Sequence, residues 1–87
     1  MNILYKYNIK PVYVLHIHRD YEWEKNFCVE VFSTLNKAKD RLKELFNLEK
    51  DEFFYDYIED EELGDNYADI NDTSNFFNLS IEKIIPR

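Results

Sequence analysis

Three potential metal ligands occupy alternate positions near the start of the chain, namely His16, His18 and Asp20. In an extended strand every second side chain points to the same face, so these three would share one face. Imidazole nitrogen and carboxylate oxygen both suit zinc, and Glu30 or Cys28 on a neighbouring strand could complete a tetrahedral site. The alternative is a pair of half-exposed strand histidines with Asp20 in the following loop. The sequence favours that alternative, so we expect no metal and no cofactor.

Cys28 is the one cysteine and the other residue with reactive chemistry. Paired with His16 or His18 on an adjacent strand, it could act as a nucleophile. Nucleophilic thiols are activated at helix N-termini or in glycine-rich turns, and the residues around Cys28 provide neither. The chain holds a single glycine, which excludes a glycine-rich phosphate loop. We therefore expect a protein that is not an enzyme; a metal-dependent enzyme built on His16, His18 and Asp20 is kept as an alternative.

The strongest chemical signal is an acidic segment. Residues 49–72 hold eleven Asp and Glu against one Lys, within a chain whose net charge is −7. The remainder of the chain is therefore mildly basic. Aromatic residues are interleaved with the acids, which is typical of a folded, partly buried segment rather than a solvated tail.

This segment has two interpretations. It could be a solvated edge that prevents sheet association and aids solubility. It could instead be a working surface, because closely spaced carboxylates on a rigid body imitate a phosphate backbone and attract a basic protein. Apolar anchors would add affinity that exposed charges do not supply. The candidate partner-binding carboxylates are Glu59, Asp60, Glu61, Glu62, Asp65, Asp69 and Asp72. The candidate anchors are Tyr57, Tyr67, Phe54 and Trp23, and a Trp23 folded back over the sheet edge is the alternative for that residue.

Composition narrows the class of protein. The hydrophobic fraction of 45% and aromatic fraction of 17% predict a folded domain, and 87 residues suffice for one. The acidic balance argues against direct binding of nucleic acid or of an anionic membrane. A single cysteine gives no sign of an oxidising compartment, and we find neither a membrane-spanning run nor a signal peptide. We therefore expect a cytoplasmic protein.

The residues that carry these candidates must be positioned by a few periodic elements. Residues 12–18 and 27–32 alternate as strands, joined by a long polar loop. In the first strand Tyr13, Leu15 and Ile17 share one face. In the second we assign Phe27, Val29 and Val31 to one face and Cys28, Glu30 and Phe32 to the other.

A helix follows, capped by Ser33 or Thr34 and ending near Asn47. Its apolar stripe is Leu35, Ala38, Leu42, Leu45 and Phe46. We expect a third strand at 53–58, a loop with one helical turn at most over 60–75, and a fourth strand at 76–85. Residues 3–9 could add an edge strand.

One amphipathic helix and an antiparallel sheet with one apolar face predict an α+β two-layer sandwich, with four or five strands in the order ββαββ. We expect residues 1–87 to form a single small domain with an acidic insert at 49–72. The far face of the sheet would carry His16, His18, Cys28, Glu30, Asn78 and Ser80.

The chain also resembles a group of small bacterial and phage proteins. The resemblance lies in Tyr13-Val14-Leu15-His16 and in Val31-Phe32-Ser33-Thr34 running into Lys37-Ala38. It covers about residues 12–46 and, more loosely, 76–84, and it implies no reaction, cofactor or catalytic residue. The long acidic insert departs from the usual pattern of that group. The general composition is similar to that of phage-encoded inhibitors of host defence.

We therefore expect a non-enzymatic binding protein, encoded by a phage or mobile element. It would inhibit a host nucleic-acid-handling complex through an acidic surface that imitates nucleic acid. Its partner would be a basic protein surface, with no membrane and no direct nucleic-acid contact. The alternative is a small housekeeping interaction domain that uses its sheet face or an edge strand.

Overall fold

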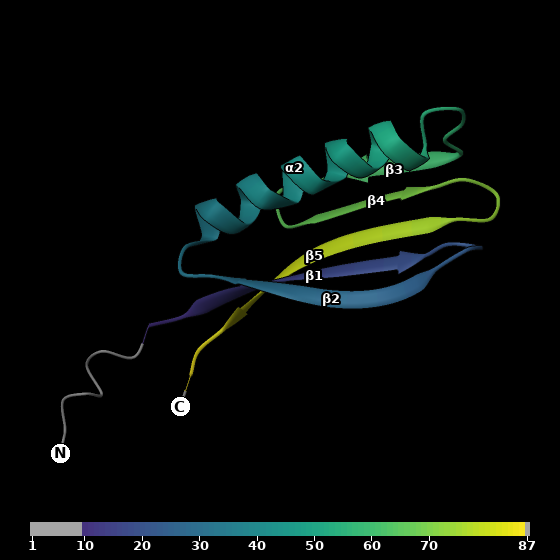
Figure 1. The fold of residues 1–87 in the computed structure, drawn as a ribbon. Helices are drawn as coiled ribbons and strands as arrows, with labels where there is room; N and C mark the ends of the chain where they lie inside the picture. The colour runs from purple at the N-terminus through teal and green to yellow at the C-terminus, as the bar shows by residue number, and fades with distance from the viewer. Residues whose placement is uncertain (1–9, 87) are drawn as a thin grey trace, which may run out of the picture.

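One helix lies across one face of a five-stranded antiparallel sheet (Figure 1), which confirms the expected α+β fold. The computed structural model describes residues 10–86, so the edge strand expected at 3–9 lies outside the described residues. The sheet order is β2-β1-β5-β4-β3. The elements along the chain are β1 (Val12–Asp20), β2 (Lys25–Phe32), α2 (Leu35–Phe53), β3 (Asp60–Leu63), β4 (Tyr67–Asn71) and β5 (Phe76–Ile84).

The strand β1 contributes two large side chains to the core. It pairs antiparallel with β2 on one side and with β5 on the other. Leu15 and Ile17 point to the helix side and are almost fully buried, as expected from the alternation. They join one cluster with helix and β5 side chains, which include Leu42, Phe46, Phe77 and Leu79. Burial of this apolar surface is the main force that holds the helix on the sheet.

The start of α2 is as predicted. The Thr34 side chain accepts a hydrogen bond from the Lys37 backbone N–H at 3.2 Å and caps the helix. The predicted end at Asn47 is wrong, because the helix continues to Phe53. Its buried stripe also continues past Phe46, but the next member is Glu49. Because a carboxylate usually faces solvent, the apolar pattern in the sequence ends at Phe46, and it predicts too short a helix.

The acidic segment is not an insert outside the fold, since it supplies two strands of the sheet. The strand predicted at 53–58 is wrong: Phe53 ends the helix and an irregular stretch follows. The loop predicted at 60–75 is also wrong, because it contains the β3–β4 hairpin. The Gly64 N–H donates to the Tyr67 carbonyl at 2.7 Å in the turn of that hairpin. Acidic and Asn residues conceal the alternation of buried Ala68 and Ile70.

The two faces of β2 are the reverse of what we expected. Glu30 lies opposite Leu15, and Cys28 lies opposite Ile17. Directly paired residues share a face, so Cys28 and Glu30 are on the helix side and not on the far face. Glu30 accepts hydrogen bonds from the guanidinium of Arg41 on α2, at 2.9 and 3.1 Å. At the sheet edge the helix covers β2 incompletely, so a carboxylate is tolerated on the inner face.

The far face of the sheet has no helix on it within the described residues. His16, His18, Asn78 and Ser80 lie on this face as expected, since they pair with one another across β1 and β5. The side chains of Phe27, Val29 and Val31 join them from β2 and are 61%, 47% and 61% exposed. An apolar strip is therefore open to solvent on this face.

Candidate functional site

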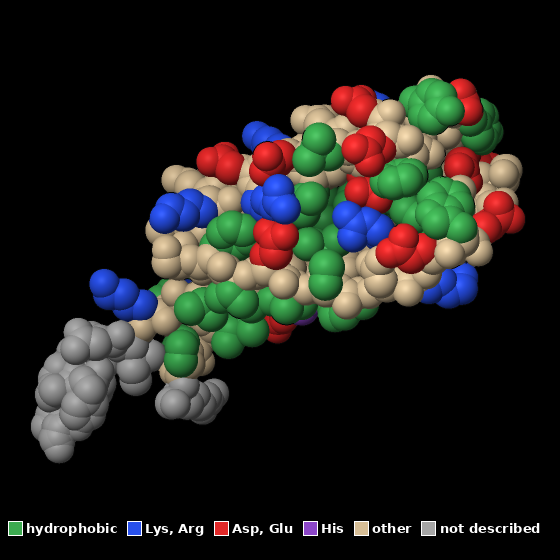
Figure 2. All heavy atoms as spheres, in the orientation of Figure 1, with side chains coloured by type: hydrophobic (Ala, Val, Ile, Leu, Met, Phe, Trp, Pro, Cys, Tyr) green, Lys and Arg blue, Asp and Glu red, His purple; other side chains and the backbone are tan. Residues whose placement is uncertain are grey.

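Four carboxylates of the acidic segment gather around the β3–β4 hairpin and face solvent. The four are Glu59, Asp60, Glu62 and Asp65, and all are exposed. Within residues 10–86, no basic group lies at ion-pair distance from any of them. Figure 2 shows carboxylates and exposed hydrophobic side chains intermixed near the C-terminal end of α2 and β3. The structure thus brings these four predicted residues together as an uncompensated acidic surface.

The other three predicted carboxylates already have partners. Glu61 accepts from the Lys50 ammonium at 2.8 Å on the helix side of the sheet. Asp69 accepts from the Tyr67 hydroxyl, and this hydrogen bond raises the pKa of Tyr67. Asp72 accepts from the Ser74 and Asn75 backbone N–H groups, each at 2.8 Å. Glu61, Asp69 and Asp72 therefore also take part in hydrogen bonds within the fold.

Asp72 caps the turn that leads into β5. Desolvation by itself would raise its pKa, but the hydrogen bonds from Ser74 and Asn75 outweigh it and lower the pKa overall. An acidic side chain that binds the backbone two and three residues ahead fixes a tight turn. Replacing Asp72 would therefore disturb the turn between β4 and β5 as well as remove a charge.

The prediction of Phe54 as an anchor is wrong, because its ring is buried in the core. The other predicted aromatic anchors are exposed, but one is also packed. Tyr57 and Tyr67 are 55% and 41% exposed. Trp23 is 56% exposed, yet its ring lies 4.9 Å from that of Tyr21 and 5.8 Å from that of Phe53. Trp23 therefore folds back over the end of the helix, and it offers only its outer face to a partner.

The geometry separates the residues of the possible metal site. His16 and His18 are on the far face, whereas Cys28 and Glu30 are on the helix side and cannot complete a site with them. The His16 Nε2 atom lies 2.9 Å from the Glu82 Oε1 atom, and the Asp20 carboxylate accepts a hydrogen bond from the Lys25 ammonium at 2.6 Å. Among the described residues, no group of three or more His, Cys, Asp or Glu side chains could hold a metal ion. The same separation removes the Cys28–His pair.

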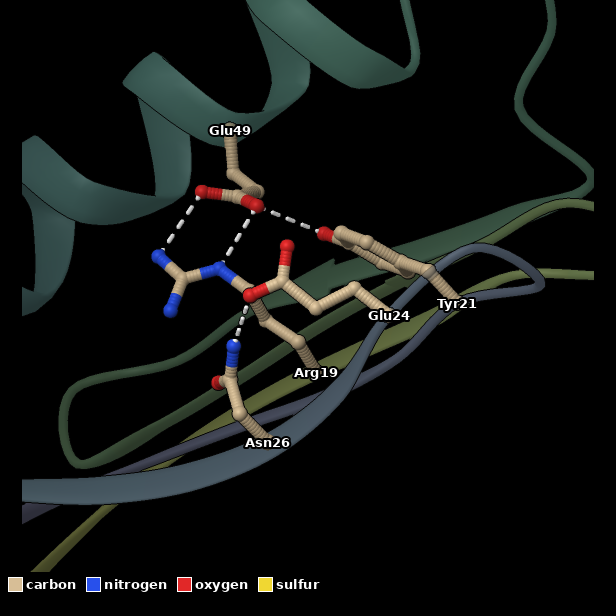
Figure 3. Close-up of polar contacts among 5 residues, drawn as sticks. All are labelled: Arg19, Tyr21, Glu24, Asn26 and Glu49. Atoms are coloured by element: carbon tan, nitrogen blue, oxygen red, sulfur yellow. Dashed lines mark hydrogen bonds and ion pairs between the residues drawn. The ribbon is translucent and has the colours of Figure 1, made fainter.

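The best-built polar site was not predicted from the sequence. The Glu49 carboxylate, 5% exposed, accepts from Arg19 Nε at 2.8 Å, from Arg19 Nη2 at 3.0 Å and from the Tyr21 hydroxyl at 2.7 Å. Figure 3 shows the three side chains converging between α2 and the sheet, with Asn26 donating to Glu24 beside them. The signal was available: an acidic residue at a buried position of the helix stripe requires a buried partner.

The contacts with Glu49 raise the pKa of both Arg19 and Tyr21. The hydrogen bond that Arg19 donates to Glu49 raises the pKa of Arg19 against the opposing effect of burial. Burial, and then the hydrogen bond to Glu49, raise the pKa of Tyr21 far above its ordinary value. Arg19 is thus held in its charged form and Tyr21 in its neutral form. These hydrogen bonds join the helix, through Glu49, to β1 and the residue that follows it.

We expect the stability of the protein to fall above pH 10 partly because of Tyr21. The ordinary tyrosine pKa is 10.0, so above it the unfolded chain loses this proton while folded Tyr21 keeps it. The tyrosine contribution is intact below pH 10 and declines above it, by about 1.4 kcal/mol for each pH unit. Urea unfolding at several alkaline pH values, in wild type and Tyr21→Phe, measures this difference. Equal slopes in the two proteins would contradict the prediction.

An open groove of about 580 Å³ lies where β2 meets the start of α2. It is lined by Phe32, Lys37, Asp40, Arg41 and Glu44. Arg41 is bonded to Glu30 and to Glu44, and these contacts raise its pKa. The lining charges thus largely neutralise one another, and the lining side chains include no nucleophile. The groove gives no support to a catalytic role.

No helix of the described residues is long and apolar enough to cross a membrane. Comparison with known proteins finds no matching family model, no matching curated protein and no matching solved structure.

Proposed function

We propose that this protein is a non-enzymatic binding protein that docks its acidic hairpin onto a basic surface of a nucleic-acid-handling protein. In its most specific form, the protein is a phage- or mobile-element-encoded inhibitor of a host defence complex. It imitates the charge of nucleic acid and occupies the channel where nucleic acid would bind.

The observation that carries the proposal is the set of unpaired carboxylates on Glu59, Asp60, Glu62 and Asp65. They are exposed on or next to a hairpin that is paired to the core strand β5 through β4. The rigid support matters, because charges held in place lose little freedom on binding. Their mutual repulsion costs stability in the free protein, and a basic partner relieves it.

Two exposed tyrosines lie close to these carboxylates in the sequence and would provide apolar contact. Tyr57 precedes β3 and Tyr67 begins β4, so they flank the acidic strand in the sequence. Both combine a large exposed ring with a hydroxyl, the combination found at many binding hot spots. The carboxylates would steer the encounter, and the rings would slow dissociation.

The test is a pull-down from lysate of the host cell with a four-site variant: Glu59→Gln, Asp60→Asn, Glu62→Gln and Asp65→Asn. The wild type is expected to capture a nucleic-acid-binding protein and to displace its nucleic acid in a filter-binding assay. The variant is expected to lose most of this capture while it keeps or slightly gains thermal stability, because repulsive charges are removed. Capture by the wild type should weaken as salt is added.

The matched control removes the same number of carboxylates elsewhere: Glu22→Gln, Asp40→Asn, Asp51→Asn and Glu52→Gln. These four are exposed and lie outside the hairpin. The control variant is expected to capture and displace like the wild type. Salt-independent capture that the hairpin variant retains would contradict the proposal.

A further inference from the structure

The strand β2 has features that the acidic hairpin does not explain. It is an edge strand of eight residues whose outer side pairs with no strand of the described chain. Figure 2 shows hydrophobic side chains along the lower border of the molecule, where Figure 1 places β2. An unpaired edge next to an exposed apolar strip is a template for strand addition.

The apolar strip is held in a defined shape. The Phe27 ring stacks on His16, with ring centroids 5.7 Å apart, and meets His18 edge to face at 6.2 Å. These contacts with β1 fix the ring on the far face of the sheet. A preformed apolar surface loses little side-chain freedom when a partner covers it.

The two edges of the sheet differ in how they are protected. The edge strand β3 is four residues long and carries Asp60, Glu61 and Glu62, so a second copy is repelled there. On the far face of β2, Lys25 is the one charged residue, and the apolar residues Phe27, Val29 and Val31 come after it. Only the β2 edge is thus electrostatically compatible with a copy of itself.

Charge also decides how a copy would approach. The rest of the far face carries carboxylates at Asp60, Glu62, Asp69 and Glu82. Two copies stacked face to face would bury these groups with few basic residues to pair them. Two copies joined edge to edge at β2 place the acidic halves at opposite ends of one long sheet.

We propose that β2 pairs antiparallel with β2 of a second copy of this chain and forms a continuous ten-stranded sheet. The two-fold axis passes at Val29, which lies opposite Val29 of the partner subunit. In this register Phe27 lies opposite Val31 of the partner subunit, so every apolar residue of the strip meets another. The dimer presents one acidic hairpin at each end, and the proposal does not rest on the function of those hairpins.

Val29→Glu is the direct test, because it places two carboxylates opposite each other at the axis. Sedimentation over a concentration series is expected to show wild type at twice the 10.7 kDa chain mass. The dissociation constant of Val29→Glu is expected to rise by at least about tenfold. Leu48→Glu is the matched control: Leu48 on the helix is 49% exposed against 47% for Val29, and its variant should dimerise like wild type. Circular dichroism checks that both variants fold.

Cys28 gives an independent measurement of the geometry. It is exposed on the helix side of β2, and across the proposed axis the two Cys28 residues are diagonal neighbours, roughly 7–8 Å apart. A short bismaleimide is expected to link two wild-type chains, and Cys28→Ser should abolish the link but leave the dimer intact. In a face-to-face dimer the two thiols would lie on opposite outer sides.

Three results would overturn the proposal. The first is a wild type that stays monomeric throughout the series, which would leave the edge to an extended segment of another protein. The second is a dimer that Val29→Glu and Leu48→Glu affect equally. The third is a dimer that Val29→Glu disrupts but in which Cys28 does not cross-link, which would indicate stacked faces.

Discussion

Replacing Glu49 by alanine is expected to lower the free energy of unfolding by about 3 kcal/mol. The change leaves the Arg19 guanidinium and the Tyr21 hydroxyl without their acceptor in a partly buried site. Loss of one partner of a fully buried pair costs somewhat more, but the Arg19 side chain keeps 21% of its exposure and recovers some solvation. A domain of this size has roughly 5–10 kcal/mol of stability in total, so the loss is large.

Urea unfolding followed by circular dichroism measures this effect. Glu49→Gln, which keeps an acceptor oxygen but loses the charge, is expected to cost about half as much as Glu49→Ala, roughly 1.5 kcal/mol. The matched control is Glu52→Ala on the exposed side of the same helix, with an expected change within about 0.5 kcal/mol. A Glu49→Ala protein as stable as the Glu52→Ala protein would show that the buried network does not hold the helix to the sheet.

The second large effect contrasts two phenylalanines on opposite faces of the sheet. Phe77 is fully buried against the helix, whereas Phe27 is 61% exposed on the far face. Phe77→Ala removes a core ring and leaves a cavity, with an expected loss of about 3–5 kcal/mol. Phe27→Ala is expected to cost less than about 1 kcal/mol in the monomer.

Thermal and urea unfolding at low protein concentration compare the two variants without a contribution from association. The pair also tests the face assignment of β2, since the sequence alone placed Phe27 and Cys28 on the wrong sides. Equal destabilisation by the two substitutions would mean that Phe27 lies in the core.

The two ends of α2 differ in how well the sequence predicts them. The helix start was predictable because Thr34 and the stripe from Leu35 are local signals. The helix end was not, because Glu49 interrupts the apolar pattern and its partners lie 28 and 30 residues away in sequence. The helical period places Glu49 on the buried stripe, but a local pattern does not identify the partners that it meets across the fold.

The β2 faces and the β3–β4 hairpin failed for a related reason. Alternation in a strand divides its residues into two sets, but only the neighbouring strand decides which set is buried. Phe27, Val29 and Val31 are the more apolar set, and yet Glu30 is the residue that reaches the helix. In the hairpin, the buried residues Ala68 and Ile70 are enough to hold a strand whose other residues are mostly polar.

The candidate site was predictable in composition and not in detail. The acidic segment and its exposed tyrosines were visible in the sequence. The structure was needed to separate the uncompensated carboxylates from those with local partners. Asp65 and Asp72 are both acids of the same segment and look alike in the sequence. Asp72 accepts hydrogen bonds from the backbone of Ser74 and Asn75, which makes it part of a turn.

The position of β5 has a consequence for how the chain reaches its native state during synthesis. Among the described strands β5 is the last to be made, yet it lies between β1 and β4, and Val12 pairs with Ile84. Until β5 leaves the ribosome, the β1–β2 and β3–β4 hairpins have no strand to connect them, and the helix has only part of a surface to cover. Pairings so distant in sequence slow folding, because a long loop must close before they form. The sheet is therefore completed only after β5 has been made, and the nascent hairpins present their apolar sides to the cell until then.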